Sequence, residues 1–473
     1  MQRRSTSESS RVEVEVPYGA WFEETSLRLA FPPGWEVRRA DPDDAPEIDD
    51  AAVEAALAAP VGAPPLLERA RGRRRAVIAV DDLTRPTPAH RLLPPVLRIL
   101  GEAGLPAEAI TILLGTASHR PPTRDEQVRK LGAEVVARHP VVVHDFLGRD
   151  VRRVGWIDGG PVDLNPHFLD ADLRILMGGV IPHNETGFGG GAKMVVPGLA
   201  GHATIAHFHG ALPPRLAGVL DDGGRRDRRT WAERVAREVG VDFTLCAVVN
   251  SRRRLAGLVA GDVVDAHRAA GRLARDVGRT RLARSELDRT DVVVVNAYPL
   301  DTDPVQMGKS VNLATKLGAR STVVINAASD GIFYHGMGMG SGVHAPRLLR
   351  NLPRWLATPR AIGTWLRSLG SALPNPLLAA RLTYFTLNPL SWAAFAAADG
   401  ARVDSGEEAG AATAADPLVF SRGFPSWGLR RKFPNGRLFR DWDALVRVLA
   451  ERHPRGRALV FPCAPLQLVE LGD

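Results

Sequence analysis

The chain has 473 residues, of which 45% are hydrophobic and 24% charged, and its formal net charge at pH 7 is +8. At roughly 100–200 residues per domain, this length predicts two or three domains with sizeable hydrophobic cores. The composition is that of an ordinary globular protein, so it excludes long-range disorder, a collagen-like repeat and a disulfide-stapled scaffold.

The sequence pI of about 10.0 makes nucleic-acid binding an alternative that has to be weighed. The arginines, however, are scattered along the chain and interleaved with acidic residues. The short arginine runs at residues 73–75 and 252–254 flank apolar segments, so we interpret them as the solvated ends of strands. A positive field also suits an acidic small-molecule substrate, and we expect no nucleic-acid partner.

The two cysteines, Cys246 and Cys463, lie far apart in apolar segments and form no CxxC pair. We therefore expect two buried free thiols rather than a disulfide or a thiolate metal cluster. Residues 1–12 are polar and lack the apolar core of a signal peptide, which predicts a cytoplasmic protein. The apolar stretch at residues 377–398 is interrupted by an arginine, an asparagine and a proline, so no membrane span is expected.

The first part of the chain alternates apolar runs with amphipathic patterns. After a hairpin that begins at residues 12–16, continuous apolar runs rich in β-branched residues are typical of strands buried on both faces. The predicted strands are residues 76–80, 110–114, 141–143 and 173–177. The predicted helices are residues 88–101 and 123–131.

A second alternating pattern follows a charged helical segment at residues 261–284. Its predicted strands are residues 291–296, 322–326 and 458–461, and its predicted helices are residues 309–317 and 441–450. Residues 346–427 show no such alternation and are rich in Pro, Trp, Leu and Ala, so we interpret them as a partly helical insertion.

Strands that alternate with helices predict an α/β fold: two α/β domains with mostly parallel sheets and an active-site cleft between them. Ligands of such sheets bind beyond the carboxyl ends of the strands, so the polar clusters found there are the candidate sites. We expect a disordered tail at residues 1–11, an N-terminal catalytic and cofactor-binding domain at 12–262, a helical linker at 263–288 and a C-terminal α/β domain at 289–473.

The first polar cluster has the sequence DLTRP at residues 82–86 and follows the strand at residues 76–80. We expect Thr84 to cap the next helix, with Pro86 in its first turn. A helix N-terminus beside an arginine is a ready anion site. An ordinary capped turn is the alternative interpretation.

The second cluster, GTASHR at residues 115–120, follows the strand at residues 110–114. His119 is a candidate acid/base residue, because histidine titrates near neutral pH. A purely structural histidine is the alternative at this position.

The third cluster, HNETGFGGGAK at residues 183–193, is rich in glycine. Glycines such as Gly190 and Gly191 let the backbone approach a ligand closely. An alanine precedes the lysine, and Met194 stands where a P-loop has Ser or Thr, so the segment is not a nucleoside triphosphatase motif. No G-x-G-x-x-G fingerprint follows a strand, so a standard NAD enzyme is not supported either.

Lysine is rare in this chain, with five residues against more than fifty arginines. Two of the five, Lys193 and Lys309, lie in polar loops at predicted strand ends. An amine can lose its proton and bond covalently to a ligand, whereas a guanidinium does not readily do so. The choice of lysine therefore indicates a chemical need for an amine.

Two further clusters carry ligand-binding side chains. His202, His207 and His209 fall within eight residues, and imidazoles bind Zn, Cu, Fe or Ni. A helix would place His202 and His209 on one face, whereas a strand would pair His207 with His209. Gln306 and Lys309 combine an amide with an ammonium near a helix N-terminus and are suited to hold a carboxylate. Structural histidines and a solvated lysine are the alternatives.

Taken together, these five clusters resemble the nickel-dependent lactate racemase family in their order and in their separations. The resemblance extends from about residue 12 to residue 326 and returns only loosely near the C-terminus. Phe208 stands where an asparagine is expected beside the metal-binding histidine, and His207 adds another imidazole there. The segment at residues 346–427 has no counterpart.

The resemblance implies a nickel-pincer nucleotide, a pyridinium mononucleotide whose sulfur groups bind nickel. Lys193 would tether this cofactor covalently, and His209 would ligate the nickel. His119 and His183 would be the paired catalytic acid/base residues. Asp82, Thr84, Arg85, Gly190 and Gly191 would line the cofactor, and Arg85, Gln306 and Lys309 would bind the substrate.

The implied function is racemisation or epimerisation of a small 2-hydroxy carboxylic acid by reversible hydride transfer through a 2-keto acid. Enzymes of cofactor biosynthesis would then be required partners. The residues do not distinguish between 2-hydroxy acids, and they do not define an oligomeric state. A non-catalytic metal- or nucleotide-binding protein on the same scaffold is the alternative function.

Overall fold

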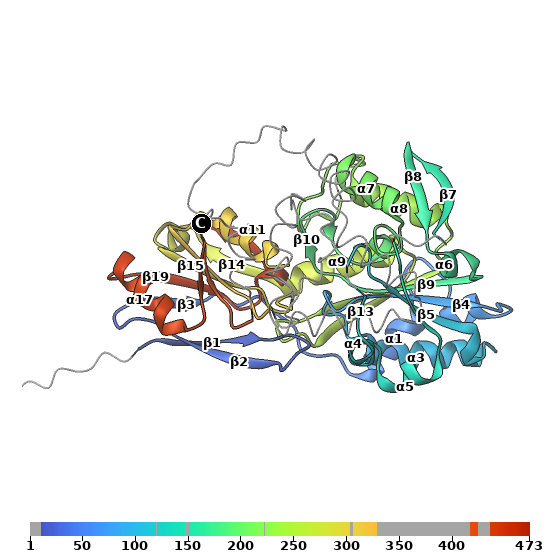
Figure 1. Cartoon of the computed structure of the whole chain (residues 1–473), viewed down its shortest axis with the longest axis horizontal. Coiled ribbons are helices and arrows are strands. Elements are labelled where there is room, and N and C mark those ends of the chain that lie inside the picture. Colours follow the sequence, from blue (N-terminus) through green and yellow to red (C-terminus); the bar gives the residue numbers. More distant parts are fainter. Residues whose placement is uncertain are drawn as a thin grey trace, which may run out of the picture. The chain divides into compact units, whose positions relative to one another are not determined.

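The computed structural model describes residues 11–119, 121–146, 151–221, 223–302, 306–328, 417–423 and 436–473. These residues form two compact units, whose elements are labelled in Figure 1. The first unit joins the described parts of residues 1–42, 279–329 and 408–473, whereas every described residue of the second unit lies within 43–278. Both units combine helices with mostly parallel sheets, which confirms the predicted α/β class.

The second unit is built on a six-stranded sheet in the order β13-β12-β9-β4-β5-β6. Neighbouring strands are parallel except for β13, which pairs antiparallel with β12. The four strands predicted in the first part of the chain are confirmed. The strands of this sheet are β4 (Ala76–Asp81), β5 (Ile110–Gly115), β6 (Val141–Val143), β9 (Leu173–Gly179), β12 (Phe243–Val249) and β13 (Leu255–Gly261).

Helices cover both faces of this sheet (Figure 1). Successive residues of a strand point to opposite faces, so Val77 and Ala79 of β4 pack in one core with α6, α7 and α8. Ile78 and Val80 pack in the other core, with α1 to α5. The helices of this unit are α1 (Asp50–Ala58), α2 (Leu66–Ala70), α3 (Ala89–Glu102), α4 (Arg124–Leu131), α5 (Ala133–Arg138), α6 (Pro166–Asp170), α7 (His202–Gly210), α8 (Arg228–Glu238) and α9 (Asp265–Gly278).

The helices that follow β4 and β5 begin in different ways. Before α4, the Thr123 side chain accepts from the Glu126 backbone N–H while the Glu126 carboxylate accepts from the Thr123 N–H, which makes a capping box. α3 begins only at Ala89 and has no side-chain cap. The predicted cap at Thr84 is therefore wrong, because its hydroxyl donates to Asp82 Oδ1 at 2.5 Å inside a longer loop.

The first unit contains a second six-stranded sheet, in the order β18-β17-β16-β15-β19-β3, in which all neighbouring strands are parallel. Its strands are β3 (Glu36–Arg39), β15 (Val292–Asn296), β16 (Ser321–Ile325), β17 (Leu418–Phe420), β18 (Arg437–Phe439) and β19 (Arg457–Phe461). Around it are the β1 (Glu13–Tyr18) and β2 (Thr25–Ala30) hairpin, the β14 (Arg279–Ala283) and β20 (Leu468–Gly472) pair, α10 (Arg284–Asp288), α11 (Gly308–Leu317) and α17 (Trp442–Arg452).

The compact units differ from the predicted domain boundaries. Residues up to 42 belong with the C-terminal half, because β3 pairs with β19. The predicted linker at 263–288 contains α9, which packs on β12 and β13 of the second unit. Within the predicted insertion at 346–427, β17 is a strand of the six-stranded sheet of the first unit. The rest of the insertion, outside residues 417–423, lies beyond the described residues. These boundaries depend on pairing between strands that are distant in the sequence, and such pairing produces no local sequence pattern.

Three smaller expectations concern the ends, the cysteines and membranes. Cys246 and Cys463 are buried free thiols, as predicted. The expected disordered tail lies outside the described residues apart from Arg11. In the described part of the chain, no helix is both long and apolar enough to cross a bilayer. The apolar stretch at residues 377–398 lies outside that part.

Candidate active site

The polar clusters of the second unit lie at one edge of its sheet. β4 has β5 on one side and β9 on the other, and all three strands run parallel. Their carboxyl ends therefore face the same way. The loops that follow them carry Asp82 after β4, His119 after β5 and His183 after β9.

Asp82 and His119 are in direct contact. His119 Nδ1 lies 2.5 Å from Asp82 Oδ2. A carboxylate oxygen accepts, so Nδ1 carries the hydrogen and Nε2 is the basic nitrogen of the neutral ring. The backbone N–H of Thr84 donates to Asp82 Oδ1 at 2.9 Å, and the Thr84 hydroxyl donates to the same oxygen. The Asp82 carboxylate is therefore fixed on both oxygens.

The charge of Asp82 is stabilised by its neighbours. Burial by itself raises the pKa of this carboxyl, but His119, Arg85 and the Thr84 hydroxyl together hold the pKa well below its usual range. Arg85 is held by its own loop, since its Nη1 donates to Thr84 Oγ1 at 3.0 Å and to Thr84 O at 3.1 Å. The structure thus brings Asp82, Thr84, Arg85 and His119 into one cluster.

A buried ion pair contacts the loop that carries this cluster. It was not predicted from the sequence. Lys130 Nζ on α4 lies 2.7 Å from Asp81 Oδ1 at the end of β4. The same ammonium donates to the Arg85 carbonyl at 3.1 Å. Burial lowers the pKa of Lys130, and the Asp81 carboxylate opposes that shift. The one available signal was compositional, because Lys130 is among only five lysines in the chain.

His183 is held in the opposite way to His119. It ends β10 (Pro182–His183), which forms a short hairpin with β11 (Gly187–Phe188). The backbone N–H of Glu185 in the connecting turn donates to His183 Nδ1 at 3.2 Å. Nδ1 is therefore an acceptor, and the hydrogen of the neutral ring is on Nε2. The two predicted acid/base histidines are thus held in opposite tautomers.

His209 is the histidine of α7 that meets a carboxylate. Its Nδ1 donates to the Ile205 carbonyl at 3.1 Å, and its Nε2 lies 3.3 Å from Glu185 Oε2. The segment is helical, which confirms the first of the two alternatives, so His202 and His209 lie on the same face of α7. His207 packs instead on Trp231, with ring centroids 5.1 Å apart. Glu185 was part of the quoted motif, but sequence reasoning gave it no role.

Charged groups, among them both Asp82 and Glu185, act on the pKa of the Lys193 amine. It follows Gly190 and Gly191 in a short 3-10 turn and is half-buried. Burial and the charges of Arg85 and Arg229 lower the pKa of Lys193 to about 7, against the opposing effect of Glu185 and Asp82. A substantial fraction of this amine is therefore neutral, and hence nucleophilic, near neutral pH.

The glycines before Lys193 are required by packing. Gly190 and Gly191 have φ of +70° and +57°, which side-chain-bearing residues rarely adopt. A Cβ on Gly191 would come within 2.8 Å of His267 Cδ2, and one on Gly190 within 3.0 Å of Gly179 O. The loop therefore lies against the end of β9 and against α9.

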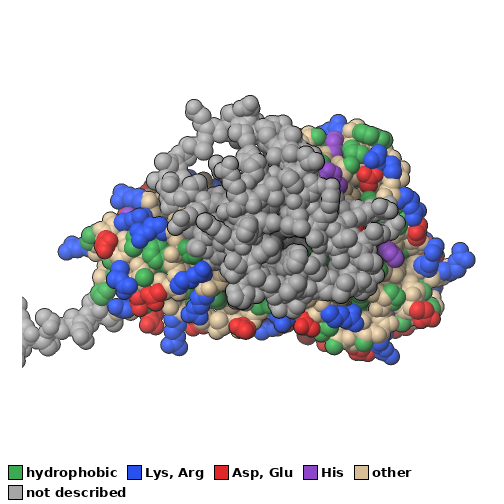
Figure 2. Space-filling model, viewed as in Figure 1, with side chains coloured by type: hydrophobic (Ala, Val, Ile, Leu, Met, Phe, Trp, Pro, Cys, Tyr) green, Lys and Arg blue, Asp and Glu red, His purple; other side chains and the backbone are tan. Residues whose placement is uncertain are grey.

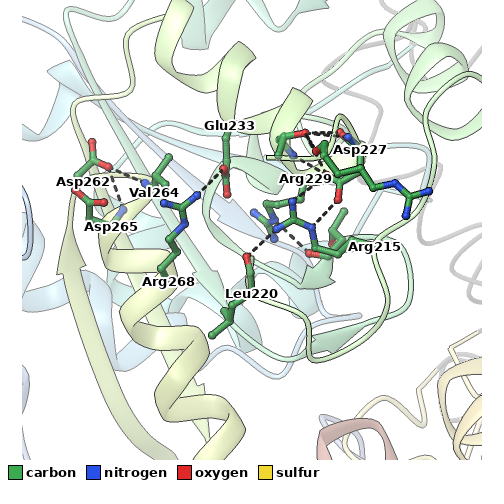
Figure 3. A network of polar contacts seen from close by, with 12 residues as sticks. Arg215, Leu220, Asp227, Arg229, Glu233, Asp262, Val264, Asp265 and Arg268 are labelled. Carbon is green, nitrogen blue, oxygen red and sulfur yellow. Dashed lines mark hydrogen bonds and ion pairs between the residues drawn. The ribbon is translucent and has the colours of Figure 1, made fainter. Parts of the chain in front are cut away.

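Two buried side chains, Arg229 and His267, hold the main chain of this loop. Arg229 donates to Thr186 O at 3.3 Å, to Gly190 O at 3.2 Å and also to Phe188 O. His267 Nε2 donates to Gly189 O at 2.9 Å. Figure 3 shows Arg229 within a wider polar network that includes the buried Arg215–Asp227 ion pair and the Arg268–Glu233 pair. Lys193 thus follows a stretch of loop in which four carbonyls, those of Thr186, Phe188, Gly189 and Gly190, accept hydrogen bonds from buried side chains.

The remaining predicted residues, Gln306 and Lys309, belong to the first unit. Lys309 lies in the first turn of α11, and its Nζ donates to Gln306 Oε1 at 2.7 Å. The structure therefore brings the amide and the ammonium into contact at the start of α11. His144, in contrast, is a buried structural histidine, since Nε2 donates to Ala200 O and burial lowers its pKa to about 4.

The donor set suits a metal that is held mainly by a cofactor. In the part of the chain that the structure describes, no group of three or more His, Cys, Asp or Glu side chains is arranged to hold a metal ion. His209 offers a single imidazole nitrogen, with its other nitrogen fixed on a carbonyl, as is usual for metal ligands. Lys193 offers an amine that can bond covalently. One protein ligand and one tether fit a metal that a covalently bound cofactor carries.

Known proteins resemble this chain in sequence. Residues 22–216 match the family model of the lactate racemase N-terminal domain. The chain is 29% identical over 326 residues to a lactate racemase from Lactiplantibacillus plantarum, which covers 64% of this chain and 75% of that protein. It is also 28% identical over 284 residues to a lactate racemase from Thermoanaerobacterium thermosaccharolyticum. That alignment covers 58% of this chain and 65% of the relative.

Solved structures share the fold. The lactate racemase apoprotein from Thermoanaerobacterium thermosaccharolyticum matches with a TM-score of 0.63 at 20% identity, covering 97% of this chain and all 100% of that one. A protein from Thermotoga maritima matches with a TM-score of 0.56 at 17% identity, covering 90% and 99%. The domain match over residues 22–216 and the two sequence relatives make this chain similar to the lactate racemase family and support an isomerase.

Proposed function

We propose that this chain racemises or epimerises a small 2-hydroxy carboxylic acid with the help of a nickel-pincer nucleotide. The observation that carries the proposal is the pair of opposite tautomers at one edge of the sheet. Asp82 keeps the hydrogen of His119 on Nδ1, and the Glu185 amide keeps that of His183 on Nε2. An interconversion of enantiomers in which one histidine takes the hydroxyl proton and the other returns a proton to that oxygen uses a basic Nε2 on one ring and an Nε2–H on the other.

The residues of the second unit account for how the cofactor is held. Lys193 bonds to it covalently, and His209 Nε2 ligates its nickel. Asp82, Thr84 and Arg85 line it together with the backbone of Gly190 and Gly191. When bound, the cofactor supplies a group that accepts and returns the hydride of the substrate carbinol carbon.

The proton steps belong to the histidines. His119 Nε2 accepts the hydroxyl proton of one enantiomer, and Asp82 stabilises the resulting imidazolium. His183 presents its Nε2–H to the oxygen of the keto intermediate. Donation of that hydrogen as a proton requires His183 to be protonated at Nδ1 as well, which ends its contact with the Glu185 amide. For the other enantiomer the two histidines exchange roles.

The substrate carboxylate is assigned to cationic and amide groups. Within the first unit, Gln306 and Lys309 supply an amide and an ammonium, which are donors that a carboxylate requires. The Lys309–Gln306 contact of 2.7 Å supports this assignment, because it holds the ammonium beside the amide before any substrate arrives.

The test is to co-produce the chain with the enzymes of cofactor biosynthesis and to measure its intact mass, its nickel content and its activity on a panel of 2-hydroxy acids. We expect a nucleotide-sized adduct on Lys193, about one nickel per chain, and interconversion of at least one pair of stereoisomers. Lys193→Ala is the matched control and should carry no adduct. An unmodified wild-type chain without nickel would contradict the proposal and favour a non-catalytic scaffold.

A further inference from the structure

Glu185 touches two predicted functional histidines at once. It lies in the turn between β10 and β11, where its backbone N–H donates to His183 Nδ1 at 3.2 Å. Its side chain reaches the other way, and Oε2 lies 3.3 Å from His209 Nε2 on α7. One residue therefore joins the candidate acid/base imidazole to the candidate metal-binding imidazole.

The carboxylate of Glu185 is fixed by a buried arginine. Arg228 Nη1 lies 2.9 Å from Glu185 Oε1. The same guanidinium donates from Nε to Phe208 O at 2.9 Å and from Nη2 to His209 O at 2.6 Å, at the end of α7. Arg228 thus holds both the carboxylate and the main chain of His209. The side chains of Glu185 and His209 meet in a geometry set by a common anchor.

The His209 nitrogen that faces Glu185 is the one that is not bonded to the main chain. His209 Nδ1 is committed to the Ile205 carbonyl at 3.1 Å, which leaves Nε2 as the ligand atom. His207 is not an alternative ligand on this face, because its ring packs on Trp231, and a Cβ on Gly160 would lie 2.4 Å from its Nε2. Glu185 is therefore the carboxylate that any cation on Nε2 of His209 meets.

We propose that Glu185 is a positioning residue for the metal-binding imidazole. Its carboxylate, anchored by Arg228, sets the orientation of the His209 ring and places a negative charge next to the cation that Nε2 binds. This inference rests on the proposed function, since it requires His209 to ligate the nickel. In this assignment Glu185 acts on the metal through His209, and Lys193 remains the covalent tether.

The role predicts a specific separation of effects. Glu185→Gln keeps the size of the side chain and removes its charge, and it leaves the backbone N–H to His183 in place. Partners that orient a metal ligand typically contribute 10–100-fold in metal affinity, so we expect nickel to leave the variant roughly 10-fold faster or more. Glu185→Asp keeps the charge with a shorter reach and should lie between Glu185→Gln and the wild type.

The experiment uses the loaded protein, co-produced with the cofactor-biosynthesis enzymes. The rate of nickel loss to a chelator and the absorption spectrum of the bound nickel are measured for the wild type and both variants. Intact mass reports the adduct on Lys193, and thermal unfolding reports the fold. Glu238→Gln is the matched control, because Glu238 is an exposed carboxylate that pairs with Arg234 on α8.

The outcomes are distinct. Faster nickel loss and an altered spectrum in Glu185→Gln, with adduct mass and unfolding temperature like those of Glu238→Gln, support the role. A nickel-loss rate and spectrum equal to those of the wild type overturn it while leaving the proposed function intact. If Glu185→Gln does not fold, unchanged nickel kinetics in Glu185→Asp overturn it equally. A wild-type chain without adduct and nickel removes the proposed function and this inference together.

Discussion

Lys130 Nζ lies 2.7 Å from Asp81 Oδ1, and both side chains are buried at the end of β4. The other oxygen of Asp81 accepts from the Thr87 hydroxyl at 2.6 Å and from the Gly179 N–H at 2.9 Å. Lys130 also donates to the Arg85 carbonyl. This pair therefore ties α4 and two strands of the sheet to the loop on which the candidate site is built.

Replacing Lys130 by Met should destabilise the second unit strongly. Removing one partner of a buried ion pair leaves an uncompensated charge, here that of Asp81, and typically costs about 3–5 kcal/mol of the free energy of unfolding. Denaturant unfolding of the cofactor-free chain measures the effect. The double variant Lys130→Met, Asp81→Asn should recover part of the loss, because the orphaned charge is removed as well.

An exposed ion pair provides the comparison for that prediction. Arg98 on α3 pairs with Glu54 and Glu102 at the surface, and such pairs contribute roughly 0–1 kcal/mol. Arg98→Met should therefore have little effect on unfolding. If Lys130→Met is no more destabilising than Arg98→Met, the Lys130–Asp81 pair does not anchor the loop.

Lys193 should make stability depend on pH. Its folded pKa of about 7 lies below that of an unfolded lysine, so between pH 7 and about 10 the unfolded chain binds more protons than the folded chain. Stability therefore rises with pH in this window. Lys193→Met should raise the unfolding temperature of the cofactor-free chain at pH 7, and the gain should shrink towards pH 10.

The control for this window is Lys316→Met, which replaces an exposed lysine on α11. Its effect on the unfolding temperature should be the same at both pH values. A Lys193→Met gain that is equally large at pH 7 and pH 10 would show that the wild-type amine does not have a lowered pKa.

Asp82→Asn should reduce catalysis with little change of fold. The amide can donate to His119 Nδ1 as readily as it can accept, so the tautomer with a basic Nε2 is no longer enforced. Positioned acid/base catalysis contributes roughly 10²–10⁴-fold, and kcat should fall within that range in both directions of the reaction. Asp50→Asn, which alters an exposed carboxylate paired with Arg91, should leave kcat unchanged. Equal kcat in the two variants counts against His119 as the base.

Arg229→Lys should loosen the glycine loop while it keeps the charge. An ammonium cannot reach the carbonyls of Thr186, Phe188 and Gly190 together, and each buried group left unsatisfied costs about 1–3 kcal/mol. We expect a loss of at least about 2 kcal/mol in denaturant unfolding and a smaller fraction of chains with an adduct on Lys193. Arg234→Lys, an exposed change on the same helix, is the control. An unaltered adduct fraction would mean that the loop does not need Arg229.

Several central strands of both sheets could be predicted because they are buried on two faces, whereas β12 and β13 were not predicted. β4, β5 and β9 appear in the sequence as unbroken apolar runs, and the structure extends each of them by one or two residues. The short strand β3 could not be found in this way. Its pattern of Glu and Arg around a single valine becomes a strand only by pairing with β19, which lies at the other end of the chain.

The candidate site was predictable as a set of loops but not as a set of contacts. His119 and His183 could be located because each lies a few residues after a buried strand of the sheet, β5 and β9 respectively. The role of Glu185 depends on α7 packing across the hairpin, which no spacing reveals. Arg229 stands among other arginines of α8 in a protein rich in them, and its complete burial follows only from the tertiary fold.

The pairing of β3 with β19 also has a consequence for how the chain is made. All described elements of the second unit come from one continuous stretch, residues 43–278. The six-stranded sheet of the first unit, in contrast, contains strands from near both ends of the chain. Domains generally fold as units during synthesis, N-terminal parts first. We therefore expect the loop with Lys193 and the helix with His209 to be folded on the ribosome while residues 12–42 still wait for their partner strand. The groups assigned to hold the cofactor would then be in place before the first unit can close its sheet.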